Sequence, residues 1–198
     1  MIHTARLARP LVFLLCALPV GRLAIDLADG TLAANPMPEV IRSTGLWSLR
    51  LMVIGLALSP LRELTGWAGA VALRRMLGLF AAFYAAMHLL AWARHYRFDW
   101  PFLLDETLTA RYLTVGAIAA LLLIPIAITS SNRLHAALGW RVWGGIHALI
   151  YPTVIAAYVH DLMARRFDRV EALATGSAIA ALLAWRVARR MRRPRSAG

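Results

Sequence analysis

The chain has 198 residues, 60% of them hydrophobic, and its mean hydropathy is +0.61. Several runs approach the roughly 20 apolar residues needed to cross about 30 Å of hydrocarbon, which excludes a water-soluble domain. The net charge is +12 and every one of the 22 basic residues is Arg. Because these arginines flank the apolar runs, they favour anionic lipid head groups over nucleic acid as partners. The composition therefore predicts an all-α integral membrane protein with a single domain.

Cys16 is the only cysteine in the sequence, which limits disulfide bonds and cysteine-ligated metal sites. One cysteine excludes an intrachain disulfide, an iron–sulfur cluster with cysteine ligands and a Cys-rich zinc site. Cys16 lies within an apolar run, and we expect it to pack in the protein interior.

The N-terminal segment places arginines before an apolar run, a pattern that signal peptides and first transmembrane helices share. We predict a transmembrane helix at 11–27. No small-x-small cleavage motif follows the run, and Arg22 and Asp26 have the i,i+4 spacing of an ion pair on a helix.

The second predicted helix covers residues 45–58 and follows a Gly- and Pro-containing loop at 29–43. Thr44 is a candidate N-cap of this helix, and Pro60 is expected beyond its end. Arg50 falls inside the apolar run. Its side chain either extends to the membrane interface or forms an ion pair with a buried carboxylate such as a haem propionate.

Four further apolar runs complete a predicted bundle of six transmembrane helices. These helices are expected at residues 76–92, 112–128, 142–163 and 172–185. The polar segments between them predict connections at 60–75, 94–111, 130–141 and 165–169.

The arginines predict the orientation of this bundle in the bilayer. With six helices both termini lie on one side, and thirteen arginines fall on that side against seven on the other. Cytoplasmic loops of membrane proteins carry the excess of positive charge. We therefore predict a multi-pass membrane protein with both termini in the cytoplasm.

Three histidines lie within the apolar runs: His88 on the third predicted helix, and His147 and His160 on the fifth. An imidazole in a hydrocarbon-spanning helix needs a hydrogen bond, a cavity or a metal. Histidines on two long helices are typical of haem iron ligation. Two alternatives stand beside this one: polar residues that only bridge helices, and a transporter or channel whose histidines relay protons.

The rise of about 1.5 Å per residue gives the depth of each histidine. His88 lies roughly 20 Å from the cytoplasmic Arg74, at a depth that His160 also reaches, so this pair can ligate one iron from both sides. His147 lies about 20 Å from His160 and cannot serve the same iron. A second haem would need a histidine at the position of Arg74, and arginine can bind a propionate but not iron. One haem or two remain open, and a quinone is an alternative at His147.

Short segments over residues 44–160 carry a resemblance to a known family. They are TGLWSLR at 44–50, SPLRELTG at 59–66, RRMLGL at 74–79, RYLTVG at 111–116, TS at 129–130 and LGWRVW at 138–143. Together with the three histidines, they resemble the MsrQ family, the haem-binding membrane subunits of bacterial periplasmic protein-methionine-sulfoxide reductase systems. That family belongs to the ferric-reductase-like transmembrane group. The chain departs from the family pattern at Ala148 and Pro152, beside the inner histidine.

The resemblance implies a six-helix protein of the bacterial inner membrane that binds b-type haem through His88, His147 and His160. It also implies an associated FMN, for which no binding residues can be named. Arg74 and Arg75 would neutralise haem propionates or a flavin phosphate. Electrons would come from quinol or a cytosolic flavin reductase and pass to a periplasmic molybdopterin subunit that reduces methionine sulfoxide in envelope proteins.

The chain itself is expected to carry no substrate chemistry, because the predicted helices hold no catalytic carboxylate pair and no nucleophile–base set. It also has no Gly-rich dinucleotide-binding segment. That favours an electron-transfer subunit over a superoxide-producing or metal-reducing relative, which would need a nicotinamide domain.

Overall fold

The computed structural model describes residues 2–67, 69–164 and 169–192, and these form eight helices and no strands. The helices are α1 (Ile2–Ala28), α2 (Met37–Thr65), α3 (Gly69–His95), α4 (Trp100–Thr109), α5 (Arg111–Ile128), α6 (Asn132–Ala148), α7 (Ile150–Ala164) and α8 (Arg169–Arg192). Six stretches are long and apolar enough to cross a membrane, with α6 and α7 counted together as one stretch. The predicted all-α class and the six membrane-spanning helices are thus confirmed.

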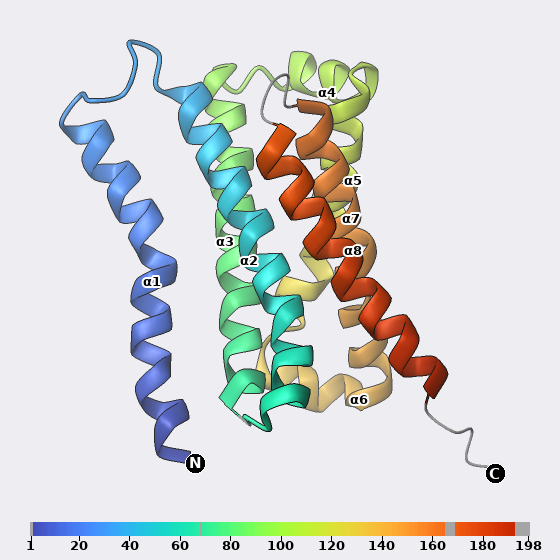
Figure 1. Ribbon diagram of the computed structural model, residues 1–198. Coiled ribbons are helices and arrows are strands. Elements are labelled where there is room, and N and C mark those ends of the chain that lie inside the picture. The colour runs from blue at the N-terminus through green and yellow to red at the C-terminus, as the bar shows by residue number, and fades with distance from the viewer. Residues whose placement is uncertain (1, 68, 165–168, 193–198) are drawn as a thin grey trace.

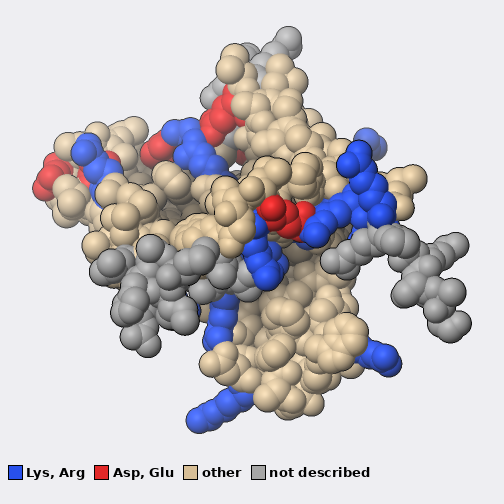
Figure 2. Space-filling model, turned by 60° about the horizontal axis from the view of Figure 1, so that its bottom comes forward, with Lys and Arg blue, Asp and Glu red and all other residues tan. Residues whose placement is uncertain are grey.

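The long helices stand side by side in a bundle, with α2 against α3 and α5 against α7 (Figure 1). Helix α1 lies at the outside of the bundle, where it packs on α3. Helix α4 covers the upper end in this view, and α6 runs across the lower end. Helix α1 begins and α8 ends at that same lower end. Figure 2 shows that blue arginine side chains predominate over red carboxylates on this face.

The perimeter of the bundle is apolar. Leu14, Leu90 and Leu121 each expose more than 60% of their surface. A contiguous apolar surface of this kind would promote aggregation in water, whereas it is the expected surface of a helix in hydrocarbon. The bundle's own core is correspondingly narrow and is built around Tyr84 and Val154, which are almost fully buried.

Helix α2 is longer than the sequence predicted at both ends. Thr44 does not cap it; this residue is fully buried inside the helix, and its hydroxyl donates to the Val40 carbonyl at 2.6 Å. Pro60 also lies within the helix, since membrane helices tolerate proline where neighbours satisfy the freed backbone groups. The helix ends at Gly66, whose φ of 69° favours glycine. The predicted connection at 60–75 is therefore mostly helical.

The predicted loop at 94–111 contains the short helix α4. Asp99 caps this helix, because its side chain accepts a hydrogen bond from the backbone N–H of Phe102 at 3.2 Å. The Thr114 hydroxyl of α5 donates to the Thr107 carbonyl of α4 at 2.7 Å. This contact ties α4 to the upper end of the bundle.

The predicted helix at 142–163 lies within one membrane-spanning stretch, Asn132–Ala164, which is divided into α6 and α7. Helix α6 has a kink at Gly139, with φ 70° and ψ 161°, and a single residue, Leu149, separates α6 from α7 while keeping helical backbone angles of φ −60° and ψ −15°. Pro152 lies in the first turn of α7, where its missing N–H cannot bond the Ala148 carbonyl. That lost bond explains why the helix is interrupted at this point.

Two other predicted boundaries also differ from the structure. Most of the predicted connection at 130–141 belongs to α6, and α8 is longer than the predicted 172–185. Within the predicted turn at 165–169, residues 165–168 lie outside the described part of the chain.

Helix α1 is held to α3 by one buried hydroxyl group. The backbone N–H of Val20 donates to the Tyr84 hydroxyl at 3.0 Å, and that hydroxyl donates to the Cys16 carbonyl at 2.8 Å. Val20 and Cys16 are four residues apart, so the Tyr84 hydroxyl is inserted into one turn of α1. Elsewhere in α1, Arg22 and Asp26 form the predicted ion pair at 2.9 Å.

Replacing Tyr84 with Phe is expected to loosen α1. The change removes both hydrogen bonds and costs about 1 kcal/mol, which accelerates local opening of α1 roughly fivefold. Amide hydrogen exchange of residues 16–24 measures this effect. Tyr96→Phe is the matched control, because no hydrogen bond within the described residues involves that hydroxyl. Equal exchange in the two variants would show that the Tyr84 hydroxyl does not hold α1.

Candidate functional site

A cavity of about 610 Å³ lies between α2, α3, α5 and α7. Its walls are mainly apolar, and both His88 of α3 and His160 of α7 line it. The volume falls in the range of roughly 300–1,000 Å³ that is typical of cofactor and small-ligand sites. The structure therefore brings together two of the three histidines that the sequence singled out.

The rings of His88 and His160 have their centroids 6.0 Å apart and an interplanar angle of 81°. Metal–imidazole bonds are about 2 Å long, so two rings on opposite sides of one metal have centroids roughly 6 Å apart. The described residues hold no group of three or more His, Cys, Asp and Glu side chains suited to a bare metal ion. Two imidazoles facing each other across an apolar cavity instead fit the axial ligands of a haem.

The backbone fixes which nitrogen of each ring can bind a metal. His88 Nδ1 lies 2.8 Å from the Ile41 carbonyl oxygen, and His160 Nδ1 lies 2.7 Å from that of Tyr112. A carbonyl oxygen only accepts hydrogen bonds, so Nδ1 carries the proton in both rings. Each Nε2 then keeps its lone pair, and no hydrogen bond within the described part of the chain engages it. Metal-ligating histidines commonly show this arrangement.

Two glycines provide the space for these rings. A Cβ atom on Gly45 would lie 2.9 Å from His88 Nδ1, and one on Gly116 would lie 2.7 Å from His160 Nδ1. Both distances are too short for real contacts. Gly45 lies one helical turn after Ile41, whose carbonyl bonds the His88 ring. Gly116 likewise lies one turn after Tyr112, whose carbonyl bonds the His160 ring. The α2–α3 and α5–α7 pairs thus contain the same glycine–histidine contact. Sequence reasoning missed both glycines, although small residues at helix contacts in membranes were a usable signal.

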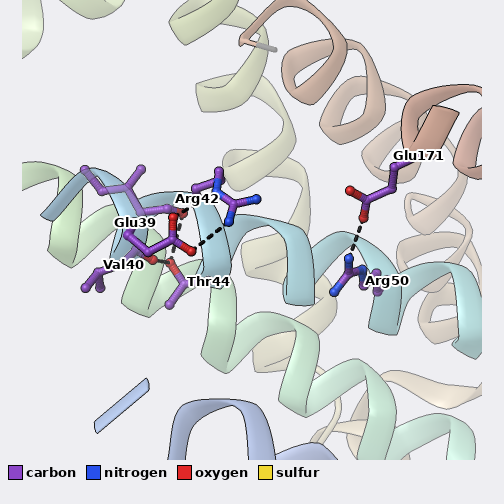
Figure 3. Close-up of polar contacts among 7 residues, drawn as sticks. Glu39, Val40, Arg42, Thr44, Arg50 and Glu171 are labelled. Atoms are coloured by element: carbon purple, nitrogen blue, oxygen red, sulfur yellow. Dashed lines mark hydrogen bonds and ion pairs between the residues drawn. The ribbon is translucent and has the colours of Figure 1, made fainter. Parts of the chain in front are cut away.

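Polar groups gather at the end of the cavity nearest α4. Arg42, His95, Thr107 and Asp161 line this end, and Arg42 is the only arginine on the cavity wall within the described residues. The Arg42 guanidinium pairs with Glu39 at 2.7 Å (Figure 3). Guanidinium and imidazole N–H groups at one end suit a ligand that carries carboxylates at one edge. The sequence analysis missed Arg42 because it lies in a segment predicted to be a loop.

Arg50 contacts a different carboxylate from the one considered in the sequence analysis. Its guanidinium forms an ion pair with Glu171 of α8 at 2.5 Å (Figure 3) and lies over the Trp47 ring at 5.0 Å. Arg50 does not line the cavity. The carboxylate that pairs with this intramembrane arginine is therefore a side chain of the protein and not a ligand group.

His147 lies apart from the cavity. Its Nε2 is 3.2 Å from the Thr129 hydroxyl, and its ring stacks on Trp143 with centroids 4.0 Å apart. His147 lies on α6, thirteen residues before His160 of α7, and it does not line the cavity. The three predicted histidines thus form one pair and one separate residue.

Arg74 and Arg75 also lie outside the cavity wall, and they make separate contacts. Arg74 donates to the Ser59 hydroxyl of α2 at 2.7 Å, whereas Arg75 bonds the Asn132 side chain at the start of α6. Neither arginine is placed to bind carboxylates of a ligand between His88 and His160.

Comparison with known proteins identifies the group to which this architecture belongs. Residues 44–158 match the family described as ferric reductase like transmembrane component. The chain is similar to the protein-methionine-sulfoxide reductase heme-binding subunit MsrQ of Rhodospirillum rubrum, with 36% identity over 96% of this chain and 92% of the relative. The corresponding protein of Herminiimonas arsenicoxydans is 38% identical over 91% of this chain and 84% of the relative. That of Xanthomonas campestris pv. campestris (strain 8004) is 43% identical over 81% of this chain and 73% of the relative. This chain belongs to the MsrQ family, within the ferric-reductase-like transmembrane group.

Proposed function

We propose that this chain is the membrane electron-transfer subunit of a protein-methionine-sulfoxide reductase system, with b-type haem held between His88 and His160. The observation that carries the proposal is the pair of imidazoles that line one cavity, each with Nδ1 hydrogen-bonded to a backbone carbonyl and Nε2 without a hydrogen bond in the described part of the chain. The names of the relatives support it, because each is called a heme-binding subunit.

The protein's own residues set the position and surroundings of that group. When bound, b-type haem supplies a one-electron redox centre. His88 and His160 would ligate the iron through Nε2, while the Ile41 and Tyr112 carbonyls hold the two rings in orientation. Arg42 and His95 would donate hydrogen bonds to the propionates at the polar end. The apolar walls keep water away and stabilise the neutral, ligating form of both imidazoles.

The two ends of the bundle would serve different partners. We propose that the end with the termini is cytoplasmic, as the excess of arginines there supports (Figure 2). Electrons would enter on that side from quinol or a cytosolic flavin reductase, with FMN as an associated cofactor. They would leave beneath α4 to a periplasmic molybdopterin-containing subunit that reduces methionine sulfoxide. His147, near the inner end, would contribute to a second haem or a quinone site.

A single-turnover reaction tests the proposed direction of electron flow. The purified chain is reduced anaerobically with dithionite and mixed with a periplasmic methionine-sulfoxide reductase subunit and free methionine sulfoxide. We expect the reduced b-type absorbance to decay and methionine to form at one molecule for every two electrons lost. Omission of the sulfoxide is the control.

Two outcomes of this reaction would contradict the proposal. In one, the absorbance persists although the same reductase subunit turns over with a dye as donor. In the other, the protein binds no haem and instead dissipates a proton gradient across vesicles, which would favour the proton-relay alternative.

A further inference from the structure

Four side chains from four helices meet at the inner end of the bundle, outside the histidine cavity. They are Ser59 of α2, Arg74 of α3, Tyr151 of α7 and Arg186 of α8. Arg74 and Arg186 donate to the same Ser59 hydroxyl oxygen, at 2.7 Å and 2.6 Å. Arg186 also bonds the Tyr151 hydroxyl and lies over that ring at 5.0 Å. We call these four residues the inner arginine cluster.

The inner arginine cluster joins two positive charges through a neutral oxygen. Both guanidinium groups bond the same atom, so their nearest nitrogens lie about 5 Å apart at most. Within the described residues neither Arg74 nor Arg186 forms an ion pair with a carboxylate. The nearby Glu63 is paired with Arg189. Two like charges at this separation repel each other, and a shared anion would relieve that repulsion.

The donors that remain favour a particular anion. Arg186 also donates to the Leu56 carbonyl at 3.3 Å, but its buried Nε has no acceptor within the described part of the chain, so this guanidinium makes fewer hydrogen bonds than it can. The Arg74 side chain is exposed, so a ligand can approach from the membrane interface. Planar guanidinium forks bind phosphate oxygens bidentately, and serine and tyrosine hydroxyls add further donors. These groups match a tetrahedral oxyanion better than a single planar carboxylate.

We propose that the inner arginine cluster binds a phosphate group, carried by an anionic phospholipid or by a soluble phosphate monoester such as a phosphorylated flavin. The phosphate would bridge Arg74 and Arg186 and fix α3, α7 and α8 at the inner end. This inference rests on the proposed function only in taking this end as the electron-entry side. The proposed phosphate site contains Arg74, as the sequence analysis expected, together with Arg186, Ser59 and Tyr151. Arg75 is not part of it.

The test compares two double variants of the full-length protein in detergent. Arg74→Gln with Arg186→Gln removes the cluster, and Arg190→Gln with Arg192→Gln removes two charges from the last turn of α8. For a soluble ligand, the affinity for FMN is compared with that for riboflavin, which lacks the phosphate. For a lipid, native mass spectrometry counts phosphatidylglycerol against phosphatidylcholine that stays bound after purification.

The proposal predicts that one of these two ligands binds at least about tenfold more weakly to the cluster variant than to the control variant. A loss of FMN's advantage over riboflavin identifies the soluble ligand, and a loss of phosphatidylglycerol identifies the lipid. Arg186→Lys, which keeps the charge without the fork, is expected to retain part of the binding. Equal binding of both ligands to both double variants overturns the proposal.

A spectrum of bound haem, recorded on the same samples, separates this proposal from the proposed function. The inner arginine cluster does not line the histidine cavity. The haem signal of the His88–His160 pair is therefore expected to stay unchanged in the cluster variant even where phosphate binding is lost.

Discussion

Replacing either His88 or His160 with Ala is expected to abolish the low-spin b-type haem signal of the purified protein. Each change removes one of the two proposed ligands, so a single imidazole is left to bind the iron. The reduced-minus-oxidised absorbance spectrum measures the loss, and a pyridine haemochrome assay counts the haem that stays bound. We expect less than about one tenth of the wild-type low-spin signal, since loss of an axial ligand costs far more than loss of an outer hydrogen bond.

His147→Ala is the matched comparison for these two variants. His147 lies outside the cavity and bonds Thr129, so its removal is expected to leave the low-spin signal of the His88–His160 pair in place. A fall in the total haem count with that signal intact would identify a second, inner haem. Loss of the low-spin signal in His147→Ala, with retention in His88→Ala, would contradict the assignment of ligands.

Adding one methyl group beside His160 or His88 is expected to weaken haem binding about as much as loss of the hydrogen bond that orients the ring. Gly116→Ala would place Cβ 2.7 Å from His160 Nδ1, and Gly45→Ala would place it 2.9 Å from His88 Nδ1. The ring must move away and lose its short bond to the backbone carbonyl. Loss of such an orienting bond typically costs about 10–100-fold in metal affinity. A haem titration of the apoprotein measures the change, which we expect to be larger at Gly116.

The chain offers two controls for this experiment. A Cβ on Gly55 or Gly78 would meet no atom within 4 Å, so alanine at either position is expected to leave haem affinity unchanged. Alanine also favours helix by about 1 kcal/mol over glycine, so none of the four variants should lose helicity. If Gly116→Ala and Gly78→Ala bound haem equally well, the glycine contacts would have no role in holding the ligands.

The sequence was sufficient to predict the parts of this fold that depend on hydrophobicity and spacing. Apolar runs of membrane-spanning length predicted six helices because hydrocarbon thickness sets that length. The depths of His88 and His160 followed from helix rise alone, and the structure places the two rings 6.0 Å apart. The i,i+4 pair of Arg22 and Asp26 is local, so it too could be predicted.

Features that depend on packing between helices could not be predicted in the same way. Gly45 and Gly116 have ordinary helical conformations, and their role appears only when a histidine from another helix packs against them. The partner of Arg50 is Glu171, 121 residues along the chain, which no periodicity within α2 can indicate.

Two further features of the structure have signals in the local sequence. The cap at Asp99 was readable in the sequence, yet the density of charges favoured a loop over helix α4. A proline inside an apolar run predicts a local interruption of the helix, and Pro152 lies just after the residue that separates α6 from α7.

The central claim is that His88 and His160 ligate the same haem iron, and electron paramagnetic resonance of the oxidised wild-type protein tests it most directly. Two neutral imidazoles whose planes lie near the observed 81° predict a low-spin ferric signal of high anisotropy, with about one such spin per chain. A high-spin signal, showing iron with a single protein ligand, would contradict the account. A protein that stays colourless after expression with ample haem would also contradict it and would return both histidines to a structural or proton-relay role.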